Sequence, residues 1–181
     1  GKSELISRRL PAFALGHRPD WHVMSASATQ TLAEDFGRDV RNIVNSPGYK
    51  ILFKTRLAAD QQARGRWRTD EGGGYYATGV DGTVIGQGGH LFTIDDLYGT
   101  WADAQSETTR KAVWTWYNST IYNRQEKDAR FCLINHRMHE FDLSGQLLEA
   151  AKHGGDQWYV INLPAIVDGN ALWPEKYSLE A

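Results

Sequence analysis

The stretch His90-Leu91-Phe92-Thr93-Ile94-Asp95-Asp96 decides the fold class of this chain of 181 residues. A short apolar run that ends in turn-forming residues predicts a buried strand. Such a strand would hold the Asp95 carboxylate rigidly at the edge of a sheet, where it can order the ligand shell of Mg²⁺. Asp96, the next carboxylate, can then orient or deprotonate an attacking water. The alternative interpretation is a pair of solvated aspartates at the start of a loop.

The first three residues, Gly1-Lys2-Ser3, match the end of the phosphate-binding pattern G-x-x-x-x-G-K-[ST]. Backbone N–H groups at a helix start bind phosphate oxygens, the lysine reaches the β- and γ-phosphates of ATP, and the serine hydroxyl binds Mg²⁺. The alternative is an ordinary helix start with a serine near its cap. The order of the two motifs favours a P-loop ATPase, because the Gly-Lys-Ser helix start precedes an apolar strand that ends in an acidic pair.

A third candidate position is Ile134-Asn135-His136, at the end of the next apolar run. In ATPases that couple hydrolysis to movement, a polar residue at this position senses the γ-phosphate. Asn135 and His136 are therefore candidate coupling residues. An ordinary polar strand end is the alternative.

Strand and helix patterns alternate along the rest of the chain, which predicts an α/β fold with a parallel or mixed sheet. Strands are expected at 22–26, 49–53, 67–69, 75–79, 90–94, 131–135 and 158–163. Helices are expected at 3–15, with a kink or end at Pro11, after Ser27, at 106–124 and at 142–152. Gln30 completes a capping-box pattern with Ser27, Ser46-Pro47-Gly48 should end that helix, and residues 71–74 should form a hairpin turn.

The composition is that of an ordinary globular protein, with a net charge of -2 and a single cysteine, Cys132. The charge balance provides no strong basic footprint for nucleic acid. One cysteine excludes an internal disulfide and a cysteine-based zinc ribbon within this chain. No apolar run is long enough to span a bilayer, and the sequence shows no signal peptide.

Six stretches, in order along nearly the whole chain, resemble the large subunit of bacteriophage terminases. They are Ala26-Ser27-Ala28 with Leu32-Ala33 and Phe36–Arg41; Ser46-Pro47 with Tyr49; Trp67-Arg68-Thr69 with Gly72–Tyr75, Gly79-Val80, Gly86 and Ile94-Asp95-Asp96; Ser106 with Arg110, Trp114, Trp116-Tyr117 and Ser119-Thr120; Arg137–Gly145, similar to the family's R-W-H-E-x-D-L-x-G stretch; and Leu163-Pro164-Ala165 with Leu172-Trp173-Pro174.

The resemblance implies an ATPase domain over residues 1–181, with a RecA-like P-loop core that lacks its first strand and the start of the phosphate loop. It implies ATP and Mg²⁺ as cofactors, with Gly1, Lys2 and Ser3 at the phosphates, Ser3 and Asp95 at Mg²⁺, and Asp96, Asn135 and His136 in catalysis and coupling. The implied partners are double-stranded DNA, the phage portal protein, the terminase small subunit and further copies in a ring, in the cytoplasm of the host bacterium.

The implied nuclease domain would lie beyond Ala181, so we expect this chain not to cut DNA and to be a weak ATPase or none alone. The sequence departs from the family pattern at several positions. Asp96 stands where many P-loop ATPases have Glu, and Leu97 replaces a proline. His136 replaces the usual Thr of the coupling motif, and Met138 replaces the usual Trp.

The sequence leaves three alternative interpretations: a helicase-like P-loop translocase, an inactive prophage remnant, and a histidine-based metallohydrolase. The third would use His136, His139 and Asp142 as zinc ligands. A local basic cluster of Arg64, Arg66 and Arg68 beside Trp67 either contacts DNA phosphates or is a solvated strand face.

Overall fold

The computed structural model describes residues 1–82, 86 and 88–179. Residues 83–85 and 87, within the glycine-rich passage between Gly79 and Gly89, lie outside this described part. The chain divides into two compact units, Gly1–Gln146 and Leu147–Ala181. Among the described residues, every helix is too short or too polar to cross a bilayer.

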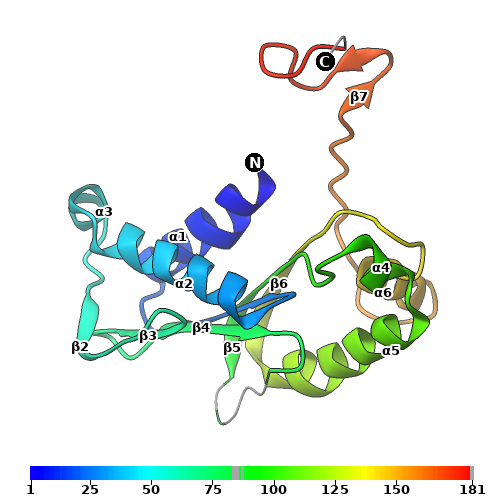
Figure 1. Ribbon diagram of the computed structural model, residues 1–181. Coiled ribbons are helices and arrows are strands. Elements are labelled where there is room, and N and C mark those ends of the chain that lie inside the picture. The colour runs from blue at the N-terminus through cyan, green and yellow to red at the C-terminus, as the bar shows by residue number, and fades with distance from the viewer. Residues whose placement is uncertain (83–85, 87, 180–181) are drawn as a thin grey trace. The chain divides into compact units, whose positions relative to one another are not determined.

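The first unit is built on a six-stranded sheet with the order β2-β3-β4-β1-β5-β6 (Figure 1). Strands β4, β1, β5 and β6 are parallel, whereas β3 pairs antiparallel with β4 and β2 with β3. The strand bounds are β1 His22–Ser27, β2 Leu57–Gln62, β3 Arg66–Thr69, β4 Gly74–Gly79, β5 Gly89–Asp95 and β6 Gln125–Ile134. The predicted α/β fold with a mostly parallel sheet flanked by helices is therefore confirmed.

Helices from the first third of the chain cover one face of this sheet (Figure 1). They are η1 Glu4–Arg9, α1 Leu10–His17, α2 Gln30–Asn45 and α3 Pro47–Leu52. Their apolar side chains, such as Leu15 and Val40, join Val23, Trp67 and Leu91 of the strands in one buried cluster. Residues spaced three or four apart on α2 make this packing face, and the buried ones are Ala33, Phe36, Gly37, Val40 and Val44.

Aromatic residues form the core on the opposite face of β5 and β6. Phe92 and Phe131 are partners in the parallel register, and their rings stack with centroids 4.3 Å apart. Tyr117 meets Phe131 edge-on at 6.4 Å. Tyr117 belongs to a helical segment made of α5 Glu107–Trp116, η2 Tyr117–Ile121 and η3 Tyr122–Arg124, preceded by α4 Trp101–Gln105. The helix predicted at 106–124 is confirmed, and Ser106 caps it.

The second unit has little regular structure. Helix α6 Leu143–Lys152 begins in the first unit and ends in the second, and Gly154 follows it with a φ of 90°. This left-handed residue is a common helix terminator, and the helix predicted at 142–152 is confirmed. A small antiparallel hairpin follows, with β7 Ile166–Val167 and β8 Asn170–Ala171. The strand predicted at 158–163 is wrong, since the structure has neither helix nor strand at these residues and Tyr159 is 90% exposed.

Two local predictions in the first unit are also wrong, both because a capping side chain acts at an unexpected position. Residues 49–53 do not form a strand, because Ser46 Oγ accepts a hydrogen bond from Tyr49 N at 3.3 Å and starts α3. Ser27 does not cap α2, because it is the last residue of β1. Thr29 caps the helix instead, with its hydroxyl accepting from Leu32 N at 3.2 Å.

The first helix continues past Pro11 to His17 instead of ending there. Proline lacks an N–H and its ring crowds the carbonyl one turn earlier. The turn ahead of Pro11 is wider than an α-helical turn, with Leu10 N donating to Leu5 O in π-helical geometry. Such a bulge accommodates a proline without breaking a helix.

Candidate functional site

Asp95 ends β5 and is buried at the carboxyl edge of the sheet, with 2% exposure. Its Oδ2 accepts a hydrogen bond of 2.5 Å from the hydroxyl of Ser7, a fully buried residue of η1. Ser27 of β1 lies beside Asp95 in the parallel register. Asp95 Oδ1 and Ser27 Oγ are buried without a hydrogen-bond partner among the described residues. Two free acceptors therefore remain at this edge.

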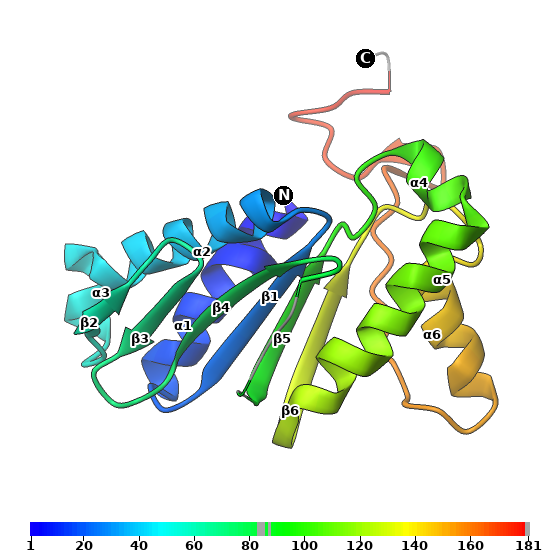
Figure 2. The same cartoon turned by 60° about the horizontal axis from the view of Figure 1, so that its bottom comes forward.

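The helix that carries Ser7 begins at the predicted phosphate motif. Lys2 is exposed and Ser3 is half-buried, and the Ser3 hydroxyl makes no capping hydrogen bond. Ser3 and Ser7 lie on the same side of the helix, because residues four apart are neighbours on a helix surface. Figure 2 shows the N-terminus on the side of the sheet toward which β6 points. The structure thus brings this helix start to the carboxyl edge of the sheet.

The resemblance implies Ser3 and Asp95 as ligands of one Mg²⁺, and no contact was predicted for Ser7. The structure places Ser7, one turn further along the helix, in hydrogen-bond contact with the Asp95 carboxylate. The spacing of four between the two serines was a signal for this, since both had to face the sheet if one did. Arg8 also fixes the helix by pairing with Asp39 of α2 at 2.7 Å.

Asp96 adopts a left-handed backbone conformation, with a φ of 45°. Its amide donates to Ile134 O at 3.0 Å and its carbonyl accepts from Ala28 N at 3.1 Å, so the residue bridges the ends of β6 and β1. Its Oδ1 accepts from His136 N at 3.1 Å and lies 3.4 Å from His136 Nδ1. The structure therefore brings together two of the predicted residues, Asp96 and His136. A non-glycine residue in this conformation stores strain and often marks a functional site.

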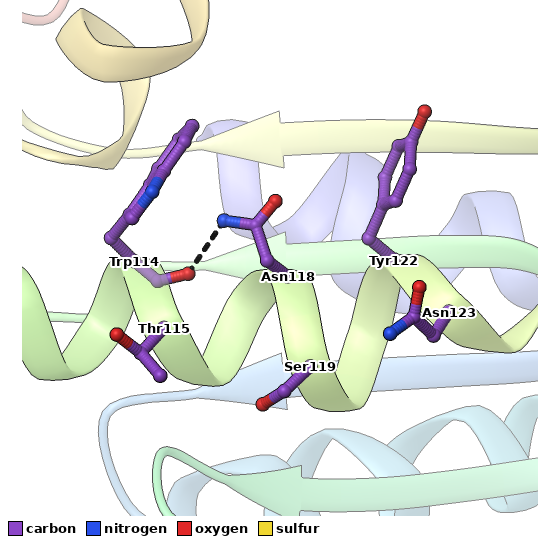
Figure 3. Close-up of a pocket in the computed structure, with 6 residues that line it drawn as sticks. All are labelled: Trp114, Thr115, Asn118, Ser119, Tyr122 and Asn123. Atoms are coloured by element: carbon purple, nitrogen blue, oxygen red, sulfur yellow. Dashed lines mark hydrogen bonds between the residues drawn. The ribbon is translucent and has the colours of Figure 1, made fainter.

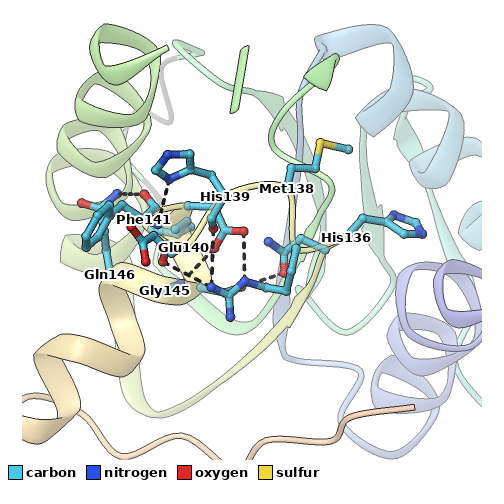
Figure 4. Close-up of polar contacts among 12 residues, drawn as sticks. His136, Met138, His139, Glu140, Phe141, Gly145 and Gln146 are labelled. Carbon is cyan, nitrogen blue, oxygen red and sulfur yellow. Dashed lines mark hydrogen bonds and ion pairs between the residues drawn. The ribbon is translucent and has the colours of Figure 1, made fainter. Parts of the chain in front are cut away.

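Asn135 connects the end of β6 to α6, because its Oδ1 accepts from Ser144 Oγ at 2.7 Å. Asp142 is fully buried and bonds on both oxygens, with Arg137 Nε at 3.0 Å and with Gly145 N at 2.9 Å. The second of these bonds satisfies an amide in the first turn of α6. Figure 4 shows these polar contacts of the turn between β6 and α6.

Further contacts make this turn compact. The Arg137 guanidinium also donates to Glu140 O at 3.2 Å. A Cβ on Gly145 would lie 1.7 Å from the same carbonyl, so only glycine fits there. The Tyr98 hydroxyl accepts from Leu143 N at 3.1 Å, and burial raises the pKa of Tyr98 to about 12. The turn is thus fixed at both ends, by Asn135 at β6 and by Tyr98 at α6.

The oxygen atoms at the sheet edge suit Mg²⁺, whereas the histidines of the turn do not form a zinc set. Mg²⁺ prefers oxygen ligands and is often held by one or two carboxylates together with substrate phosphates. Asp95 Oδ1 is a free acceptor, and the Asp96 carboxylate is partly exposed next to it in the chain. In Figure 4 the His136 ring points away from the His139 ring, and both Asp142 oxygens are already bonded. No group of three potential ligands of the zinc type occurs within the described residues.

The surface also has a shallow hollow of about 450 Å³ along α5 and its continuation. Figure 3 shows two rows of side chains spaced by four residues on this helix, Trp114, Asn118 and Tyr122 in one row and Thr115, Ser119 and Asn123 in the other. The lining carries no charged side chain and includes none of the predicted site residues. The hollow is therefore separate from the Asp95 edge.

Comparison with known proteins finds no family model and no curated protein that matches this chain.

Proposed function

We propose that this chain is part of the ATP-hydrolysing motor domain of a phage terminase large subunit, which drives double-stranded DNA into the procapsid. The observation that carries the proposal is the hydrogen bond between Ser7 and Asp95. It joins the helix opened by Gly1-Lys2-Ser3 to the strand that ends in the acidic pair. These are the two elements that a P-loop ATPase needs side by side.

The position of the helix start supports phosphate binding. The first N–H groups of a helix have no partner within the helix, and the helix dipole adds positive potential there. Ligands of α/β proteins bind outside the carboxyl ends of parallel strands, which is where this helix starts. Lys2 is exposed at that point and is free to reach a phosphate.

On this proposal the two aspartates of the acidic pair, Asp95 and Asp96, have different roles. Asp95 is buried and oriented by Ser7, so it suits a fixed position in the Mg²⁺ shell, together with Ser3. Mg²⁺, when bound with ATP, supplies neutralisation of the phosphate charge. Asp96 is partly exposed and turned toward His136, so it is the carboxylate that can orient the attacking water.

The turn after β6 supports a coupling role for Asn135 and His136. His136 contacts Asp96, and Asn135 contacts the first turn of α6 through Ser144. A displacement at Asp96 would therefore be transmitted to α6 through two adjacent residues. Small shifts at a nucleotide are converted into movement of whole elements by packed connections of this kind.

The test compares affinity for Mg²⁺-ATP with turnover in variants of the protein that contains this chain. We expect Lys2→Ala to abolish productive nucleotide binding, because Lys2 contacts the ground-state phosphates. We expect Asp96→Asn to spare binding and remove turnover, because Asp96 acts on water in the transition state. Lys111→Ala, which removes another exposed lysine, on α5, is the control. Equal loss of affinity in both site variants, or none in Lys2→Ala, would contradict the proposal.

A further inference from the structure

A continuous row of planar side chains crosses one end of the sheet. Arg18 lies over the ring of Trp21 at 5.0 Å, and Trp21 stacks on His90 at 5.7 Å. His90 is 5.7 Å from His22, and His22 meets the ring of Tyr76 at 6.2 Å. Arg66 lies over that same tyrosine ring at 5.1 Å and ends the row. A guanidinium group therefore lies at each end of a series of four rings.

The row lies on the sheet face opposite to α2. Along β3, exposed Arg66 and Arg68 alternate with buried Trp67, which packs toward α2 and donates to Gly37 O. Arg66 is the register partner of Tyr76 on β4. In Figure 1 the helices α2 and α3 lie above β2, β3 and β4, and no helix of the described residues lies below these strands. We call Arg66, Arg68, Tyr76, His22 and His90 the basic sheet face.

The arginines of this face are available to an outside partner. Arg66 and Arg68 form no ion pair within the described residues, whereas Arg64, two positions earlier, pairs with Asp35. Gly74 separates Arg68 from His22 across the sheet, and it has no side chain to fill the space between them. Two unpaired guanidinium groups on one strand face favour a partner with regularly spaced negative charges.

We propose that the basic sheet face binds single-stranded nucleic acid. Arg66 and Arg68 contact successive phosphates, because side chains two apart on a strand project from the same face about 6.6 Å apart. The exposed parts of Trp21, His22 and His90 pack against unpaired bases, because the ring faces are already partly covered by the neighbours in the row. Unpaired bases are accessible in a single strand, whereas a duplex keeps them covered. This binding needs no nucleotide and does not depend on the proposed ATPase activity.

The test measures the fluorescence anisotropy of a labelled oligodeoxythymidylate of about 15 nucleotides without ATP. The double variant Arg66→Ala/Arg68→Ala should bind at least about tenfold more weakly than the unmodified chain. Arg64→Ala is the control for the loss of one nearby arginine, since this side chain is paired with Asp35, whereas the double variant removes two unpaired arginines. It should change the affinity less than about twofold. Equal effects of the double variant and the control would overturn the assignment of this surface.

Two further measurements distinguish contacts to phosphates from contacts to bases. Each lost phosphate contact lowers the slope of log affinity against log salt by about 0.7 for a single strand, so the double variant should lose about 1.4. His22→Ala should weaken binding about fivefold or more without changing that slope, because it removes a ring from the row. His22→Ala should leave the affinity for a duplex of the same length unchanged, because the bases of a duplex are covered. Unchanged single-strand affinity in His22→Ala, or an equal loss of affinity for the duplex, would overturn the single-strand assignment.

Discussion

Ser7→Ala tests whether the first helix is docked on the acidic strand as the structure has it. The change removes the hydroxyl that donates to Asp95 Oδ2 at 2.5 Å. Both residues are buried, with exposures of 0% and 2%. Because Asp95 Oδ1 already lacks a hydrogen-bond partner among the described residues, the variant leaves both carboxylate oxygens without a side-chain donor.

The expected cost follows from this burial. A hydrogen bond to a charged group contributes about 1.5–3 kcal/mol, and an unsatisfied buried group costs about 1–3 kcal/mol. Water has little access to the site, so it cannot replace the lost donor without a rearrangement. We therefore expect the free energy of unfolding to fall by about 2–3 kcal/mol. For a domain of this size each kcal/mol shifts Tm by about 2–4 °C, so Tm should fall by roughly 4–12 °C.

Urea and thermal unfolding followed by circular dichroism measure this cost directly. Ser3→Ala is the matched control, because Ser3 lies on the same helix one turn earlier and makes no capping hydrogen bond. It should cost less than about 0.5 kcal/mol. In an Asp95→Asn background the cost of Ser7→Ala should shrink, because a neutral acceptor makes a weaker hydrogen bond. Equal costs for Ser7→Ala and Ser3→Ala would refute the docking of this helix on Asp95.

Four further outcomes are expected. Tyr98→Phe should lower the free energy of unfolding by about 1–2 kcal/mol in urea, because Leu143 N loses its acceptor, and no change would contradict that bond. In urea, the free energy of unfolding of Asp96→Gly should exceed that of Asp96→Ala by up to about 1 kcal/mol, because a φ of 45° strains alanine. The reverse order would contradict the left-handed geometry. Burial lowers the pKa of His22 below 6.5, so the folded state binds fewer protons than the unfolded state, and stability should fall as pH drops below about 6.5. His22→Gln should flatten this pH dependence, and an unchanged profile would count against it. If the chain acts as proposed, His136→Ala should reduce packaged DNA length more than ATP turnover, whereas a proportional fall in both would remove the coupling role.

The local sequence predicted those site residues whose position depends on a single strand. An apolar run followed by acidic or polar residues placed Asp95 and Asn135 at the carboxyl ends of two strands. In the structure Asp95 is the last residue of β5, and β6 ends at Ile134, one residue earlier than predicted, so Asn135 follows it. Capping side chains were harder to assign, because serine and threonine are common near helix starts. Ser46 looked like a helix stop and is both the stop of α2 and the cap of α3.

The contacts that define the site could not be read from the sequence, because they join distant parts of the chain. Ser7 and Asp95 are 88 residues apart, and Asp96 and His136 are 40 apart. The strand predicted at 158–163 is a second example, because here the local pattern predicted an element that the structure does not form. An apolar segment has strand character, but it becomes a strand only where a neighbour offers backbone hydrogen bonds. The local sequence therefore predicts the position of a side chain on its helix or strand. The contacts of that side chain depend on how the helices and strands pack.

Strand β5 contributes to both the Asp95 edge and the basic sheet face. The geometry of the strand indicates that these two surfaces act independently. Asp95 and His90 are five residues apart, so their side chains lie on opposite faces of the sheet, about 16 Å apart along the strand. Asp95 faces Ser7 and the first helix, whereas His90 faces His22 and the row of rings. Substitutions on the basic sheet face should therefore leave ATP turnover unchanged when nucleic acid is absent. An effect of nucleic acid on turnover would then have to travel through the backbone of β5 or β1, because these are the strands that the two surfaces share.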